Sequence, residues 1–237
     1  MLISIDKFLA IDKKKMYFCH AKKEANMSEG ITKEELIEQF KGNKILKYAT
    51  TVVGVIVLIV LIFLGYNRLY AGPTNEESKA MVAKGIMWME KDSTDLAIEE
   101  FEYVAAQYKG YDGAHLANYS LGNIYFEQGR YEDALDALSS VKMDDTYLMT
   151  LAIGTKGDCY SELEDYASAV NEYVKAATRR DNQQTSPLFY FKAGLNAEKA
   201  GDYAKATEFY TTIKNNYLSF ANQKGIEKYI TRASAKI

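Results

Sequence analysis

A glycine-led phrase occurs four times in the C-terminal two-thirds of this 237-residue chain. The four glycines are 37, 35 and 37 residues apart, and alanine, aromatic and large apolar residues follow each of them at fixed steps. Self-similarity at a period of about 20–50 residues is the signature of stacked repeats, which bury their apolar faces against their neighbours. The aligned positions are Gly85, Gly122, Gly157 and Gly194; then Trp88, Tyr125, Tyr160 and Ala197; then Ala97, Ala134, Ala169 and Ala206; and finally Phe101, Leu138, Tyr173 and Tyr210.

Each phrase predicts a pair of antiparallel helices. Small residues at the glycine and alanine positions let two helices approach closely, and the larger residues fill the space between them. A tyrosine stands at the turn of three of the phrases, as Tyr131, Tyr166 and Tyr203. We therefore expect about four helix pairs in an α-solenoid at 78–218, followed by a capping helix and tail at 219–237 whose inner face is Ile226, Tyr229 and Ile230. The pairs are expected at about 78–111, 115–148, 150–183 and 187–218.

A second feature is an apolar segment with no charged side chain, between Lys47 and Arg68. A helix of this length spans about 30 Å, which matches the hydrocarbon core of a bilayer. The segment is too long for a cleaved leader, and no small-x-small pattern follows it, so it predicts an uncleaved single-pass transmembrane helix. The resulting all-α chain has a head with a short amphipathic helix (1–47), one N-terminal transmembrane helix (48–67), a linker broken by Gly72-Pro73 (68–77) and the solenoid.

Charge is distributed unevenly along the chain, which has a formal net charge of -3. Residues 1–73 carry 11 Lys and Arg against 7 Asp and Glu, whereas residues 74–237 carry 18 against 25. Because positive charge collects on the cytoplasmic side, we expect a cytoplasmic N-terminus in the inner (plasma) membrane and an extracytoplasmic, periplasmic solenoid. The acidic solenoid argues against nucleic acid as a partner. Either Met1 or Met27 can be the true start.

The repeat pattern resembles that of the tetratricopeptide repeat (TPR) family. The match is carried by Leu121-Gly122-x-x-Tyr125 with Tyr131, Ala134 and Leu138, and by the corresponding residues of the other phrases. The resemblance implies that the first helix of each pair lines a concave groove for a protein or peptide. The groove residues that it implies are Val82, Ile86, Met89, Tyr119, Asn123, Phe126, Asp158, Ser161, Phe191 and Leu195. A subgroup of the family clamps a partner's terminal carboxylate with groove lysines. That activity is not supported, because the corresponding positions are Val82, Tyr119, Gly154 and Phe191.

Catalytic signatures are missing from the sequence. The two histidines, His20 and His115, lie in different segments, and no Cys/His cluster has metal-ligand spacing. Cys159 is expected to be a small buried residue rather than a reactive thiol. We therefore expect no enzyme activity, no cofactor and no metal.

Three functions remain open. A head, one span and a periplasmic TPR array resemble the ancillary SecYEG translocon subunits of bacteria. That resemblance implies a membrane-anchored scaffold that assists envelope protein export, with the translocon or a periplasmic chaperone as partner. The second possibility is a structural adaptor in envelope assembly or cell division with one fixed partner. The third is a cytosol-facing membrane receptor.

Overall fold

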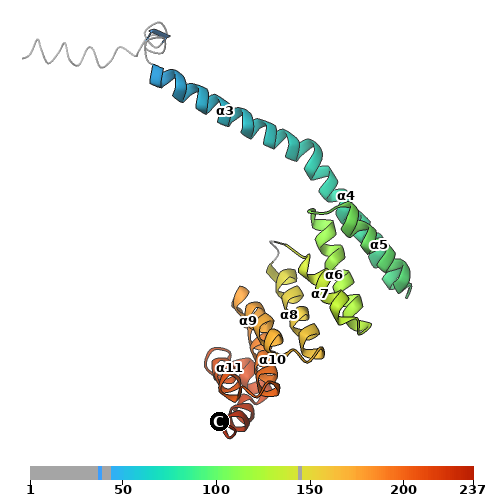
Figure 1. Ribbon diagram of the computed structural model, residues 1–237, viewed down its shortest axis with the longest axis vertical. Coiled ribbons are helices and arrows are strands. Elements are labelled where there is room, and N and C mark those ends of the chain that lie inside the picture. Colours follow the sequence, from blue (N-terminus) through green and yellow to red (C-terminus); the bar gives the residue numbers. More distant parts are fainter. Residues whose placement is uncertain (1–36, 39–43, 144–145) are drawn as a thin grey trace, which may run out of the picture. The chain divides into compact units, whose positions relative to one another are not determined.

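The computed structural model describes residues 37–38, 44–143 and 146–237. These residues are divided into two compact units at the boundary between Tyr66 and Asn67. Most of the expected head lies outside the described residues, including all of its amphipathic helix except Ile37 and Glu38. Those that are described form helices and turns, with no strand among them (Figure 1).

The first unit contains α3, which runs from Lys44 to Tyr66. The large apolar side chains between Val52 and Leu64 are all about half exposed or more, so none of the described residues buries this helix in a core. The most apolar 18-residue window of the helical stretch that begins at Lys47 has a mean hydropathy of 2.6, and none of it is buried. Among the described residues it is the one stretch long and apolar enough to cross a membrane.

The expected linker is instead helical. Residues Asn67–Ala71 form a π-helical segment, and α4 begins at Gly72 and continues to Glu90. The prediction that Gly72-Pro73 breaks the anchor helix was wrong, because the chain stays helical there and both residues lie in the first turn of α4. Proline is tolerated there, since the first N–H groups of a helix have no partner within it.

Four helix pairs make up the second unit, as predicted (Figure 1). Each helix packs against the next along the chain, and α4 also packs against α6. The first helices of the pairs are α4 (Gly72–Glu90), α6 (Asp112–Glu127), α8 (Thr146–Glu162) and α10 (Thr185–Lys199). The second helices are α5 (Thr94–Gln107), α7 (Tyr131–Ser139), α9 (Tyr166–Arg179) and α11 (Tyr203–Asn216).

The glycine phrase is a packing device, as the sequence predicted. In every pair the glycine contacts the residue sixteen positions later: Phe101, Leu138, Tyr173 or Tyr210. A β-carbon at any of the four glycines would overlap that side chain. The four phrase alanines are completely buried, and the four larger residues are at most 2% exposed. Burying a side chain of this size stabilises the fold by about 1.5–3 kcal/mol.

The turn inside each pair has the same backbone geometry. The residue seven positions after each phrase glycine has a positive φ, and these residues are Asp92, Gly129, Glu164 and Gly201. Glycine reaches this left-handed conformation freely, whereas the two acidic residues are strained by it. In the third and fourth pairs an aspartate then begins the second helix by accepting a hydrogen bond from a backbone N–H, Asp165 from Ser168 and Asp202 from Lys205, both at 3.1 Å.

The first two pairs are joined by a set of hydrogen bonds between α4 and α6, here called the α4–α6 clasp. The Asn75 amide donates to Asp112 Oδ2 at 2.9 Å and accepts from the Asp112 backbone N–H at 2.8 Å. The Gly113 N–H donates to Ser78 Oγ at 3.1 Å, and Lys79 Nζ lies 3.2 Å from Asp112 Oδ2. Hydrogen bonding from Asn75, with a further contribution from Lys79, lowers the pKa of Asp112. Asn75, expected in a linker, therefore holds two repeats together.

The end of the array is closed by two helices rather than the one expected. These are α12 (Leu218–Lys224) and α13 (Ile226–Ser234). The residue between them, Gly225, has a φ of 63°, which ends the first helix in a left-handed turn. The predicted inner face is confirmed for Ile226, which is 1% exposed, and for Tyr229 and Ile230, which are partly buried against the same core.

Candidate protein-binding surfaces

The predicted groove residues of α4 divide into one buried residue and two exposed ones. Val82 is 4% exposed and belongs to the core of the first two pairs, so its expected place in a groove was wrong. Ile86 and Met89 are 46% and 40% exposed and lie one turn apart on one face of the helix. We call the surface that these residues share with the outward residues of α6, α8 and α10 the first-helix face.

On α6 the three predicted residues lie on one stripe, because they are four and then three positions apart. Tyr119, Asn123 and Phe126 are all half-buried. The Phe126 ring is 5.7 Å from the ring of Tyr131, the turn tyrosine of the same pair. Asn123 Oδ1 accepts a long hydrogen bond from Thr155 Oγ1 on α8, at 3.5 Å. The stripe thus offers two aromatic rings with an amide between them.

The predicted residue of α8 with the most contacts is Asp158, which is already paired inside the chain. It accepts a 2.6 Å hydrogen bond from the Tyr173 hydroxyl and 2.7 and 2.9 Å bonds from Lys192 Nζ. Burial and the nearby Asp158 carboxylate strongly raise the pKa of Tyr173. Ser161, the second predicted residue of α8, is half-buried. The sequence reading missed Lys192, although it follows Asp158 by 34 residues, close to one repeat length.

On α10, Phe191 is enclosed by the chain itself. Its ring centroid lies 6.1 Å from that of Tyr210, 6.2 Å from Phe220 and 4.9 Å from Tyr229. The last two come from α12 and α13, so the closing helices cover this position. Leu195, one turn further along α10, is half-buried. Phe191 therefore contributes to internal packing, and the exposed residues among those predicted for the first-helix face, Ile86 and Met89, lie on α4.

Gly154, one of the positions compared with a carboxylate clamp, is a contact point between repeats. A β-carbon there would overlap the ring of Phe189 on α10. This close approach explains why the position carries no side chain. The surface near it is shaped by the Asp158–Lys192 ion pair.

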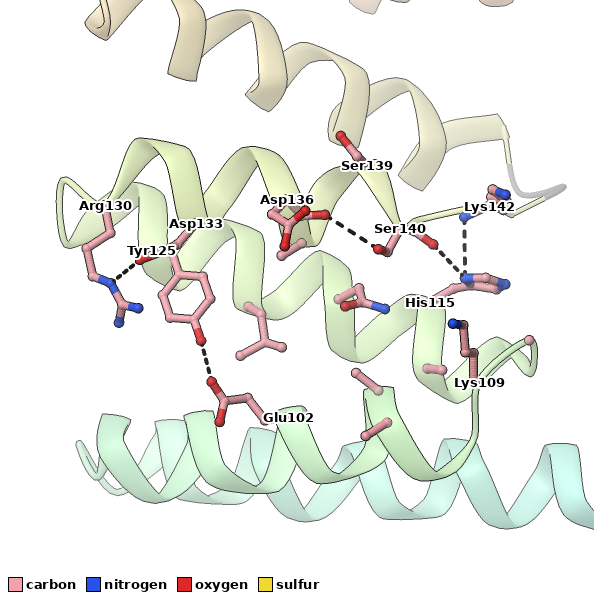
Figure 2. A pocket seen from close by; sticks show the side chains of 17 residues that line it. Glu102, Lys109, His115, Tyr125, Arg130, Asp133, Asp136, Ser139, Ser140 and Lys142 are labelled. Atoms are coloured by element: carbon pink, nitrogen blue, oxygen red, sulfur yellow. Dashed lines mark hydrogen bonds and ion pairs between the residues drawn. The ribbon is translucent and has the colours of Figure 1, made fainter.

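A groove of about 800 Å³ lies on the opposite set of helices, between α5 and α7 (Figure 2). We call it the α5–α7 groove. Its walls come from α5 and α7 and its floor from α6. The lining residues are Glu102, Ala105, Ala106, Lys109, Gly110, Ala114, His115, Asn118, Leu121, Tyr125, Arg130, Asp133, Asp136, Ala137, Ser139, Ser140 and Lys142. The sequence reading assigned no role to this surface.

The two ends of the α5–α7 groove differ. At the end near the α6–α7 turn, the Tyr125 hydroxyl donates to Glu102 at 2.7 Å, and Arg130 Nε donates to Asp133 at 2.7 Å (Figure 2). Burial, with this hydrogen bond to Glu102, raises the pKa of Tyr125 to about 12. At the other end, the His115 ring nitrogen Nδ1 lies 3.2 Å from the Ser140 carbonyl and 3.4 Å from the Lys142 backbone nitrogen.

Cys159 is completely buried, as predicted. Burial, and to a smaller extent the neighbouring Asp158, raises the pKa of its thiol to about 12. A thiol with such a pKa stays protonated at neutral pH, so it acts as a small packing residue.

Comparison with known proteins identifies the family. The tetratricopeptide repeat-like domain family matches residues 77–198, which is about half of the chain. The chain therefore belongs to the tetratricopeptide repeat-like family. None of the curated proteins matches it by sequence.

Solved structures also match this chain. The crystal structure of the nearly identical TPR-like repeats of a Podosopora anserina kinesin light chain is 11% identical and has a TM-score of 0.50. That match covers 68% of this chain and 87% of the other. The crystal structure of MamA protein is 22% identical, with a TM-score of 0.49, and the match covers 70% of this chain and 92% of that one. The first likeness shows the fold alone.

Proposed function

We propose that this chain is a membrane-anchored scaffold that binds a partner protein through the α4 and α6 part of its first-helix face. The observation that carries the proposal is the exposure of Ile86 and Met89, which are 46% and 40% exposed and share one face of α4. Exposed apolar side chains grouped on one surface are typical of protein-binding sites. Half-buried aromatic rings at Tyr119 and Phe126 add the residue type that is enriched at the centres of interfaces.

The family membership supports a scaffold, because tetratricopeptide repeats bind proteins or peptides. The partner chemistry that fits α4 and α6 is an apolar segment, with a polar group placed to reach Asn123. The next part of the face, at Asp158 and Lys192, is charged and internally paired, so it selects against an apolar guest. The proposed site therefore covers only the first two repeats.

Membrane anchoring is the second part of the proposal. It rests on the unburied apolar helix α3 and on the excess of lysine before it, which together favour a cytoplasmic N-terminus and an array on the other side. In a bacterial envelope, this arrangement suits a scaffold beside the secretion translocon that passes exported proteins to a chaperone. The two alternative functions are an adaptor with one fixed partner and a receptor that faces the cytosol.

The experiment is site-specific photocrosslinking in intact cells from a photoreactive residue at position 89 of the full chain. The same residue at position 218 is the matched control, because Leu218 is 66% exposed but lies on α12. We expect partner adducts from position 89 that disappear when Ile86→Asp is added. Equal adducts from both positions would contradict the site. A single partner in equal amount to the scaffold would indicate an adaptor, and many nascent proteins would indicate a role in export.

A further inference from the structure

The α5–α7 groove exists because the second helix of the second pair is short. The helix α7 has 9 residues, whereas α5, α9 and α11 have 14 each. Five fewer residues shorten a helix by about 7.5 Å. The chain directly after α7 packs into the core through Val141, which is 2% exposed. As a result, His115 and Asn118 of α6, both half-buried, line the groove instead of lying under a second helix.

The floor of this groove is suited to the backbone of a guest. Three alanines of α5 and α6 and one of α7 line the groove as a whole, so a guest chain can approach closely. Asn118 stands among them, half-buried on α6, and no described residue hydrogen-bonds its amide. An asparagine amide presents a donor and an acceptor side by side, which is also what one extended peptide unit presents. A helical guest has already used these backbone groups internally.

The charges of the groove give a guest its direction. Near the α6–α7 turn, Arg130 and Glu102 are occupied by Asp133 and Tyr125, as described above. At the other end, neither Lys109 nor Lys142 has a carboxylate partner among the described residues. On the α7 wall, the Asp136 carboxylate likewise has no cation partner within the described part of the chain. Among the described residues, Lys109 and Lys142 thus lack a carboxylate partner and Asp136 lacks a cation partner in the same groove (Figure 2).

We propose that the α5–α7 groove binds an extended peptide segment of a second protein partner. This segment carries an acidic side chain toward Lys109 and Lys142, a basic side chain toward Asp136 and small residues between them. The groove volume of about 800 Å³ lies within the range of specific ligand sites. Because the groove is built mainly on second helices, it differs from the site proposed on the first-helix face. One chain can therefore hold two partners at once.

The test uses the full chain in detergent micelles and fluorescein-labelled, end-blocked peptides of about eight residues. The first peptide has two glutamates at one end, small residues in the middle and two lysines at the other end. The second has the same composition with its charges alternating. We expect the first to bind at least tenfold more tightly by fluorescence anisotropy. Equal binding of the two peptides, or binding of neither at about 1 mM, would overturn the proposal.

Substitutions of groove residues test whether the peptide binds in the α5–α7 groove. Lys109→Glu with Lys142→Glu is expected to weaken binding of the first peptide at least tenfold. The control Lys228→Glu with Lys236→Glu makes the same change in net charge on and after α13 and is expected to bind like the unaltered chain. Asn118→Ala is expected to weaken binding without lowering the melting temperature. Unchanged affinity in the first variant rejects the charge assignment, and unchanged affinity in Asn118→Ala rejects recognition of the peptide backbone.

Discussion

The α4–α6 clasp yields a prediction in which two physical effects have opposite signs. Gly113 is the second residue of α6, and its N–H donates to Ser78 Oγ. In a helix, replacing glycine by alanine adds about 1 kcal/mol of stability through backbone propensity. Here, however, the new β-carbon would overlap the backbone carbonyl of Ser78 on α4, far inside ordinary contact distance. A backbone atom cannot move away as the end of a side chain can.

The magnitude follows from the packing and from the hydrogen bond. Overpacking of a filled interior costs about 1–3 kcal/mol. If α6 shifts away from α4, the buried Ser78–Gly113 hydrogen bond also breaks, and an unsatisfied buried group costs about 1–3 kcal/mol. The two costs add to about 2–6 kcal/mol, and after the propensity gain of about 1 kcal/mol is subtracted we expect Gly113→Ala to lower the free energy of unfolding by about 1–5 kcal/mol. For a domain of this size, a loss of 2 kcal/mol lowers Tm by about 4–8 °C.

The assay is thermal unfolding of the full chain in detergent, followed by far-UV circular dichroism. The comparison variant is Gly122→Ala, because the β-carbon added there meets side-chain atoms of Leu138 and no backbone atom. We expect a smaller loss for that variant, because a side chain can shift more readily than a backbone carbonyl. A Gly113→Ala protein that melts at or above the wild-type temperature would refute the packing argument, and so would a reversed order of the two variants.

Four further predictions concern separate features. Glu164→Gly should raise stability by about 0.5–1 kcal/mol in the same melts, because Glu164 has a φ of 60°. Because the pKa of Asp112 is lowered in the folded chain, its contribution to stability is complete above about pH 4 and is lost as the pH falls through that lowered pKa. The difference in the free energy of unfolding between the unaltered chain and Asp112→Asn should therefore shrink as the pH is lowered. In a Cys19→Ser chain, Cys159 should react with a thiol reagent at about pH 8 only after denaturation; reaction with the folded chain would contradict its burial. Finally, the chain should resist extraction from membranes by alkaline carbonate, and Leu58→Arg with Leu61→Arg should release it, since each central arginine costs about 2.5–3.5 kcal/mol.

The array could be predicted from the sequence because its contacts are local and periodic. Each phrase glycine meets the residue sixteen positions later, so a spacing that is visible in the sequence is also a contact in space. The capping helices were less predictable. A glycine inside a helical pattern is tolerated in many helices, and only the backbone angle of Gly225 shows that it divides α12 from α13.

The candidate sites were harder to predict, for two physical reasons. Transfer by position from the family places Val82 and Phe191 in a groove, but the first is buried in the core and the second is half-buried against rings of the closing helices. The α5–α7 groove depends on where α7 ends, and helix ends are the least certain feature of a sequence pattern. Its early end follows from the burial of Val141, which is a tertiary contact.

In the third repeat, the side chain of Tyr173 connects the buried core to the charged pair Asp158 and Lys192. Tyr173 fills the space opposite Gly157, and its hydroxyl also ends on Asp158, the carboxylate that holds Lys192. Replacing Asp158 by an apolar residue to make this surface more apolar would leave the Tyr173 hydroxyl and the Lys192 ammonium group without their shared hydrogen-bond acceptor. A change of binding specificity at this place therefore requires Tyr173, Asp158 and Lys192 to be substituted together, because a change in one of them leaves the other two without their partner.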